Sequence, residues 1–472
     1  MLIDTGELVG DLSRHLVTDE TLGLLVELAD EAGVQVQFER MARGDLVNQS
    51  EGRPALHVAL RGTGPVRVDG HDLRPRFDAG LAAQSAFADA VRSGAWRGAS
   101  GQAARHVVNL GIGGSGLGPR FALDALQHLA DGPQVHCVST SDPAALDSVL
   151  RGCDAASTMF LICSKTFSTA ETMANAERAR EWLVANGVPS SAAVSHFAAV
   201  TSQIQRAQTW GVPREQCLDL AEGIGGRYSL GSAVGLALQI ACGPEMLGEL
   251  HAGGQSIDTH FANTPAYANL PLLLGLLGIW YRNFHGLQAH AVLPYPHALR
   301  HLPAHLQQLE MESLGKRVTR CGEPVAWDTG GVIFGSSGPD AQHAFMQLLQ
   351  QGTLVIPSDI VISATDAGTP LNANALAQAD VLFHGGQAPG APSTHGAMPG
   401  GRPSSLLTVP CINARSLGAL LACYEHKVFT QAVVWDINPF DQWGVELGKQ
   451  TATRRLADKQ AGNKAPDRSQ SL

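Results

Sequence analysis

The chain has 472 residues, of which 44% are hydrophobic and 16% are charged. This composition supports a large buried core and excludes a mainly disordered protein. The 33 basic and 43 acidic residues give a formal net charge of −10, which argues against nucleic acid or an anionic membrane as the main partner. At roughly 150 residues per domain, the length allows two or three domains.

The start of the chain carries Asp4 and Glu7, where a secretory signal would place a basic segment and then an apolar one. The longest apolar run, 270–281, is well short of the about 20 residues that span a bilayer, so we expect a buried core segment there. The 8 cysteines are scattered without a C-x-x-C pair, which indicates reduced thiols. We therefore expect a cytoplasmic protein without a membrane partner.

Short apolar runs alternate with helix-length segments from about residue 105 onward, and helical spacing is clearest in 170–186. The predicted strands are 106–110, 135–139, 159–163, 331–334, 353–356 and 432–437. Continuously apolar strands that alternate with helices predict a parallel sheet covered on both faces. Because the pattern occurs twice, we predict an α/β fold with two doubly wound parallel-sheet subdomains.

The domain boundaries follow from this repetition of the pattern. We expect one subdomain at 80–241 and a second, larger one that combines 1–79 with 242–457. The Gly-, Pro- and Ser-rich stretch 384–405 lacks apolar periodicity and is predicted to be a loop. The polar residues 458–472 are expected to form a C-terminal tail.

A glycine-rich segment, Gly-Ile-Gly-Gly-Ser-Gly at 111–116, follows the first predicted strand of this region. It fits the pattern G-x-G-x-x-G, in which glycines let a phosphate approach the backbone at a helix N-terminus. A dinucleotide site also expects an acidic residue at the end of the next strand, but Asp142 lies only beyond that end. A tight turn and a nicotinamide site remain open, and contact with a sugar or sugar phosphate is favoured.

A second loop, Ser-Lys-Thr-Phe-Ser-Thr at 164–169, joins the strand 159–163 to the helix 170–186. Its hydroxyl groups, its ammonium group and the positive end of the helix can all bind one phosphate dianion. Ordinary N-capping by Ser168 or Thr169 is the alternative, and it needs only one hydroxyl. We favour a phosphomonoester site.

Three histidines recur at a spacing of four residues, which would align metal ligands on one helix face: His297, His301 and His305. Pro303 interrupts such a helix, and no H-E-x-x-H motif is present. We therefore favour solvated or capping histidines and predict no metal site.

Two carboxylates lie two residues apart at Glu310 and Glu312. On a helix they point in different directions, so they do not form a paired acid and base. Taken alone, they could simply belong to a solvated helix face.

Six longer blocks are more specific. They are VVNLGIGGSGLGP from Val107, SKTFSTAETMANA from Ser164, GIGGRYSLGSAVGL from Gly223, QQLEMESLGK from Gln307, QHAFMQLLQQGT from Gln342 and FDQWGVELGKQ from Phe440. With these blocks in this order, the chain resembles the glucose-6-phosphate isomerase (phosphoglucose isomerase) family from about residue 50 to 457. The third and the last block look like the family's two diagnostic signatures.

The resemblance implies reversible isomerisation of glucose 6-phosphate to fructose 6-phosphate, in glycolysis and gluconeogenesis, without a metal or cofactor. The reaction opens the sugar ring and moves a proton between C2 and C1 through a cis-enediolate. Glu312 matches the catalytic base, and Arg227 lies beside the developing enediolate. His343 and Lys449 match the ring-opening groups, and Glu171 orients the histidine. The implied substrate contacts are Gly114, Ser115, Ser164, Lys165, Thr166, Phe167, Ser168, Thr169, Gln308 and Gln442.

The resemblance also implies a homodimer with a shared active site, in which His343 reaches the site formed mainly by the other subunit. The chain departs from the family pattern at Glu310 and Leu314, near the base, and at Gly231, where a tryptophan is common. The alternative function is a non-catalytic sugar-phosphate sensor of the same fold. Such a sensor would keep the loop 164–169 but would not need all four catalytic groups together.

Overall fold

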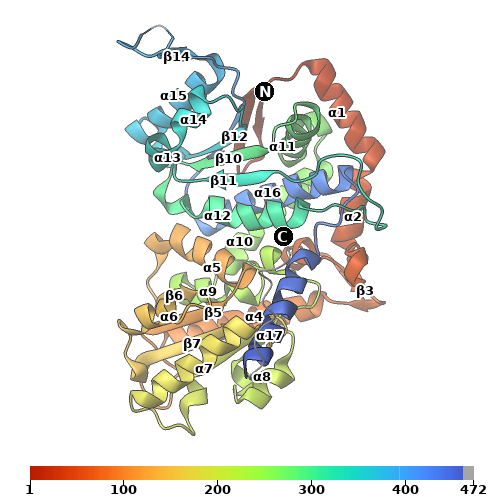
Figure 1. The fold of residues 1–472 in the computed structure, drawn as a ribbon. Helices are drawn as coiled ribbons and strands as arrows, with labels where there is room; N and C mark the ends of the chain where they lie inside the picture. Colours follow the sequence, from red (N-terminus) through yellow and green to blue (C-terminus); the bar gives the residue numbers. More distant parts are fainter. Residues whose placement is uncertain (393, 461–472) are drawn as a thin grey trace.

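The computed structural model describes residues 1–392 and 394–460 and contains two large β-sheets, one in each half of the molecule (Figure 1). The first sheet has five parallel strands in the order β6-β5-β7-β8-β9. Their bounds are β5 His106–Gly111, β6 Gln134–Val138, β7 Thr158–Cys163, β8 Phe197–Thr201 and β9 Cys217–Asp219. The predicted strands 106–110, 135–139 and 159–163 are confirmed as β5, β6 and β7.

Alternate residues of the first sheet face two separate hydrophobic cores. On β7, Met159 and Leu161 pack with the helices of one face, whereas Phe160 and Ile162 pack with those of the other face. The first face carries α4 (Arg74–Arg92) and α9 (Leu236–Cys242), and the second carries α6 (Pro143–Leu150), α7 (Ala170–Ala185) and α8 (Ile204–Trp210). Burial on both faces confirms the doubly wound arrangement and explains why these strands are continuously apolar.

The second sheet has six strands in the order β1-β2-β15-β12-β10-β11. The bounds of these strands, in sheet order, are β1 Leu2–Asp4, β2 Val9–Arg14, β15 Ser404–Val409, β12 Ser358–Ser363, β10 Ala289–Pro294 and β11 Val332–Gly335. The last four strands are parallel to one another, and β2 and β1 extend the sheet in antiparallel pairing. The prediction of α/β subdomains holds, with an antiparallel edge supplied by the start of the chain.

Helices also cover this second sheet on both of its faces. One face packs against the largest core, where α16 (Ala414–Val434) lies against α10 (Met246–Asn263) and α11 (Leu270–Ile279). The other face packs in a smaller core with α13 (Gly338–Ala344), α14 (Met346–Gln351) and α15 (Pro370–His384). The remaining α-helices are α1 Asp19–Ala32, α2 Val34–Arg43, α3 His57–Arg61, α5 Gly114–Ala125, α12 Leu302–Leu306 and α17 Glu446–Gln460.

Two predicted strands are wrong. The segment 353–356 is a bend that leads through Pro357 into β12, which begins only where the backbone pairs with β10 and β15. The segment 432–437 is the end of α16 and the turn after it. Because α16 is buried on nearly all sides, its sequence lacks the polar stripe that distinguishes a helix from a buried strand.

Three further expectations concern less regular segments. The apolar run 270–281 is the buried helix α11 and the start of a π-helical turn, as expected for a core segment. The predicted loop 384–405 contains a short hairpin, β13 Gly386–Gln387 with β14 Ala397–Met398, and its last residues belong to β15. Helix α17 extends to Gln460, so 458–460 of the expected tail are helical, and 461–472 lie outside the described residues. Within the described ranges, every helix is too short or too polar to cross a membrane.

Candidate active site

The carboxyl ends of β5 and β7 lie where the strand order of the first sheet reverses. The chain crosses from β5 to β6 on one side, and β7, β8 and β9 follow on the other side. In doubly wound sheets a crevice for ligands opens at such a switch point. Helix α5 begins directly after β5, with Ser115 in its first turn, and α7 begins after the loop 164–169. The positive ends of both helices therefore face the crevice.

Two glycines let the segments of the site approach one another. Gly113 precedes α5 with a φ of 59°, in the left-handed region that favours glycine. A Cβ on Gly114 would overlap the backbone carbonyl of Gly226, and a Cβ on Gly113 would lie 3.2 Å from Nε2 of Gln308. The glycine-rich loop thus packs the end of β5 against the two segments that carry Arg227 and Gln308.

The loop 164–169 gathers its hydroxyl groups in two pairs. The Ser164 and Thr169 hydroxyls lie 3.0 Å apart, and the Ser168 hydroxyl donates to Thr166 Oγ1 at 2.9 Å. Phe167 has a φ of 49°, and its side chain is buried in the core beneath the loop. Only the backbone of Phe167 can therefore face a ligand, while its ring anchors the loop.

Lys165 of this loop is held by backbone carbonyls. Its Nζ donates to the oxygen of Glu222 at 2.5 Å and to that of Ile224 at 3.1 Å. Burial, and then the nearby charge of Arg53, lowers the pKa of Lys165. A second cation close to this lysine strengthens the attraction for an anion.

A small cavity of about 70 Å³ lies beside Lys165. Its lining combines Gln442 and Gly226 with residues from the N-terminal region, namely Asn48, Glu51, Arg53, Pro54, Ala55 and His57. Sequence reasoning missed these N-terminal residues. They lie ahead of the six family blocks, and no local motif marks them.

Glu312 and its neighbours come from three distant segments. Glu312 ends the π-helical turn η11 (Gln307–Glu312), and its Oε2 accepts hydrogen bonds from Arg227 Nη1 at 3.1 Å and Gln308 Nε2 at 3.0 Å. The side chain of Arg227 is 1% exposed and that of Glu312 is 22% exposed. Both hydrogen bonds that Glu312 accepts from described residues go to Oε2, which leaves Oε1 for a substrate proton.

All five N–H groups of Arg227 have acceptors. Nε donates to Ser313 Oγ at 2.6 Å, and Nη2 donates to the carbonyls of Pro439 and Asp441. The two bonds of Nη1 go to Glu312 and to Gln442 Oε1, the latter at 3.3 Å. Nη1 therefore binds the proposed base Glu312 and the proposed substrate contact Gln442. The other two nitrogens, Nε and Nη2, fix the guanidinium in place. Sequence reasoning missed Ser313, Pro439 and Asp441, because neither a serine hydroxyl nor a backbone carbonyl reveals in the sequence which remote side chain it contacts.

Three expected catalytic residues are not joined to this group by hydrogen bonds in the described part of the chain. His343 is exposed on α13, in the half of the molecule that holds the second sheet (Figure 1). Lys449 is exposed on α17 and forms an ion pair with Glu446 at 2.8 Å. Glu171 is half-buried in the first turn of α7, next to the phosphate loop. Among the described residues of this single chain, none of the three contacts Arg227 or Glu312 through a hydrogen bond or an ion pair.

The sequence also drew attention to the carboxylates at 310 and 312 and to the three histidines at 297, 301 and 305. Glu310 is 4% exposed and forms a buried ion pair with Lys427 at 2.9 Å, so a solvated helix face is wrong for this residue. The three histidines at 297, 301 and 305 do not form a ligand set within the described part of the chain. His305 is instead buried and stacks on Phe121.

Comparison with known proteins decides the family. A family model described as "Phosphoglucose isomerase" matches residues 11–471. The chain belongs to the phosphoglucose isomerase family. The glucose-6-phosphate isomerase of Paraburkholderia xenovorans (strain LB400) is 47% identical over 462 residues, covering 94% of this chain and 85% of that protein. The isomerase of Burkholderia ambifaria (strain MC40-6) is 46% identical over 465 residues, covering 95% and 85%.

A solved structure supports the same relation. The crystal structure of a glucose-6-phosphate isomerase from Chlamydia trachomatis has a TM-score of 0.88 and 32% identity, and the match covers 99% of this chain and 91% of that one. A Thermus thermophilus protein with 24% identity and a TM-score of 0.74 shares the fold. The family assignment therefore agrees in sequence and in fold.

Proposed function

We propose that this protein is an enzyme that interconverts glucose 6-phosphate and fructose 6-phosphate. The observation that carries the proposal is the Glu312 carboxylate, held by Arg227 and Gln308 in a chain that belongs to the phosphoglucose isomerase family. The relatives named above as glucose-6-phosphate isomerases support it. The substrate is therefore a small sugar phosphate.

The loop 164–169 and the positive ends of α5 and α7 would bind the phosphate group, which fixes the sugar beside Glu312. Glu312 Oε1 takes the proton from C2 of the open-chain aldose and returns it to C1, while the hydroxyl proton passes from O2 to O1 of the enediolate, so the carboxylate is regenerated in each cycle. The enediolate between these steps carries negative charge next to Arg227. A cation fixed in advance stabilises charge that appears only along the reaction, and this lowers the barrier.

Ring opening must come first, because the C2 proton is acidic only beside a carbonyl group. His343 and Lys449 are the groups proposed for this step, and Glu171 would orient the histidine. His343 lies on α13 beside the second sheet and, among the described residues of one chain, has no hydrogen bond to Glu312 or Arg227; this supports a site completed by a second subunit, so we propose a homodimer with His343 acting across the interface.

The sensor alternative needs only a phosphate loop. It gives no reason for a carboxylate with one free oxygen beside a fully anchored guanidinium. Nicotinamide binding is also less suited to the glycine-rich loop, because its glycines are used for packing against Gly226 and Gln308.

The direct test is to incubate the purified protein with fructose 6-phosphate and follow the appearance of glucose 6-phosphate in the presence of a chelator. We expect conversion without added metal, because the phosphate loop is built from hydroxyls and a lysine. Absence of conversion would count against the proposed function. Conversion that requires added zinc or magnesium would count against the proposed chemistry.

A further inference from the structure

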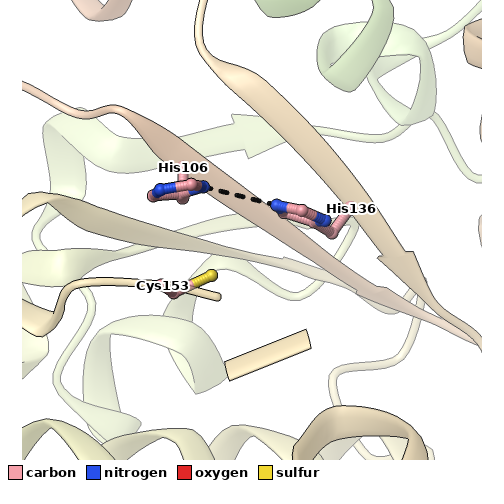
Figure 2. Close-up of side chains that lie close together, drawn as sticks. All are labelled: His106, His136 and Cys153. Carbon is pink, nitrogen blue, oxygen red and sulfur yellow. Dashed lines mark hydrogen bonds between the residues drawn. The ribbon is translucent and has the colours of Figure 1, made fainter. Parts of the chain in front are cut away.

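Three potential metal ligands lie together at the amino-terminal end of the first sheet, away from the crevice. His106 begins β5 and His136 lies on the neighbouring strand β6. His136 is paired with Val108, and residues two apart on a strand share a face, so both imidazoles project from the same side of the sheet. Figure 2 shows the two rings next to each other, with the sulfur of Cys153 directed toward them. One ligand atom of each residue lies within 4.8 Å of the others.

We propose that His106, His136 and Cys153 bind a soft divalent metal ion, with Zn²⁺ as the best fit. His106 Nδ1 and His136 Nε2 are 3.4 Å apart and share a hydrogen bond (Figure 2), which a bound ion would replace. Two nitrogens bound to a tetrahedral zinc ion at 2.0–2.1 Å lie about 3.3 Å apart, so little movement would admit the ion between them. Two imidazoles and a thiolate are typical zinc ligands, and a water molecule would complete the tetrahedron.

The ligands must be deprotonated when they bind a metal ion, so binding would release the thiol proton of Cys153. All three side chains are partly exposed, which gives the ion a path to the site.

The position of the site indicates a structural role. His106 lies five residues before Gly111 on β5, which is about 16 Å at 3.3 Å per residue. The proposed metal site is therefore remote from the crevice. β6 is an edge strand of the sheet, and Cys153 lies in the segment between α6 and β7. A bound ion would tie the edge strand, its neighbour and this segment together. It should therefore change stability and leave the isomerase chemistry unchanged.

Co²⁺ is the first probe, because a cobalt–thiolate bond has a charge-transfer band in the near ultraviolet. Purified full-length protein without a histidine tag is stripped with a chelator, freed of the chelator and titrated with Co²⁺. We expect one Co²⁺ per chain with a thiolate band, and loss of this band in Cys153→Ser. Cys321→Ser is the matched control, since Cys321 is an exposed free thiol elsewhere, and it should keep the band. No thiolate band in the wild type, or a full band in Cys153→Ser, would overturn the proposal.

The second probe is thermal unfolding in the presence of Zn²⁺, and it tests the ligand His136 in place of Cys153. Because Zn²⁺ would bind the folded state, it should raise the Tm of the wild type, and His136→Ala should lose this shift. Outer-shell changes already cost 10–100-fold in metal affinity, so loss of a direct ligand should cost at least about 100-fold. His128→Ala, an exposed histidine of the same subdomain, is the control. An equal Zn²⁺ shift in the wild type and in His136→Ala would show that the ion binds elsewhere. Retained isomerase activity verifies that each variant has folded.

Discussion

Arg227 is the residue whose surroundings say most about the proposed chemistry. Three of its N–H groups bind Ser313 and two backbone carbonyls, and only Nη1 has side-chain partners that a substrate could displace. The guanidinium is therefore preorganised, and no rearrangement is needed when charge develops on the substrate. A lysine could not reproduce this arrangement, because it lacks the planar fork of five donors.

Arg227→Lys should lower kcat by about 10²–10³-fold, the usual cost of losing one preorganised donor at a developing negative charge. KM should change much less, because the phosphate loop 164–169 is untouched. Steady-state kinetics with fructose 6-phosphate measures both values. If kcat stays within a few-fold of the wild type, Arg227 is not beside the enediolate.

The sequence identified Arg227, Glu312, Gln308 and Gln442 because they lie inside long family blocks, and the structure joins these four by hydrogen bonds. It did not identify the groups that hold Arg227, although Ser313 and Asp441 lie in the same blocks, because a sequence does not show which hydroxyl or carbonyl faces a remote side chain. The metal ligands were missed for a related reason. They come from two strands and a loop, so no fixed spacing connects them.

At the scale of elements, a buried charge cluster joins three helices. Asp258 of α10 accepts two hydrogen bonds from Arg61 of α3, each 2.7 Å long, and a third contact of 2.7 Å from His426 of α16. Burial alone would raise the pKa of Asp258, but Arg61 and then His426 lower it to about 2. The cluster fixes the short helix α3, which is continuous with the N-terminal wall of the cavity.

Asp258→Asn should destabilise the fold by about 1–3 kcal/mol, because Arg61 loses a two-bond partner in a buried site but keeps its ion pair with Glu425 at 2.6 Å. Asp147→Asn is a matched control, since Asp147 binds Arg178 with the same two-bond geometry, but both of those side chains are more than 40% exposed. This control should lose much less stability, because solvent screens an exposed ion pair. Urea denaturation of both variants measures the difference. Equal effects would show that burial does not strengthen the Asp258 pair.

The same cluster gives a pH dependence with a definite sign. Because the pKa of Asp258 lies below its ordinary value of 3.8, its stabilising contribution is complete above that pH and is lost as the pH falls toward about 2. The stability difference between wild type and Asp258→Asn should therefore shrink as the pH is lowered through this window. A difference that grows instead would contradict the lowered pKa.

The secondary structure could be predicted best where the apolar periodicity of a segment and its length indicated the same kind of element. Strands β5, β6, β7 and β11 are short and apolar and are followed by turns or helices, so their patterns were decisive. The end of α16 was misassigned because a helix buried all round has no polar face to reveal its period. The antiparallel edge formed by β1 and β2 could not be foreseen, since it depends on pairing with β15, almost 400 residues later in the chain.

At the scale of the whole molecule, the two sheets support a division into two subdomains. All strands of the first sheet lie between His106 and Asp219, and those of the second lie at the start of the chain and after Ala289. We propose boundaries at 80–241 for the first subdomain, with 1–79 and 242–457 in the second. The site would then lie between them, with the phosphate loop on one and Glu312 on the other.

The proposed shared site predicts complementation between inactive chains. Glu312→Gln and His343→Ala should each be nearly inactive, yet a mixed dimer would hold one site with both lesions and one site with neither. Equal amounts refolded together make about half of the dimers mixed, so about a quarter of the wild-type activity should return. The chains must be unfolded and refolded together, because a large interface exchanges slowly. No recovery despite proven heterodimers would show that His343 acts within its own chain.

The central claim is that Glu312 carries the proton between C2 and C1. The most direct measurement is deuterium incorporation into the sugar from D₂O, followed by NMR, in wild type, Glu312→Gln and Glu222→Gln. Glu222 lines the cavity beside Lys165, whereas the carboxylate that Arg227 binds is that of Glu312, so Glu222→Gln controls for loss of a carboxylate alone. We predict that Glu312→Gln slows incorporation and isomerisation together by at least about 10²-fold while substrate still binds, and that Glu222→Gln changes them little. Incorporation near the wild-type rate in Glu312→Gln would contradict the claim.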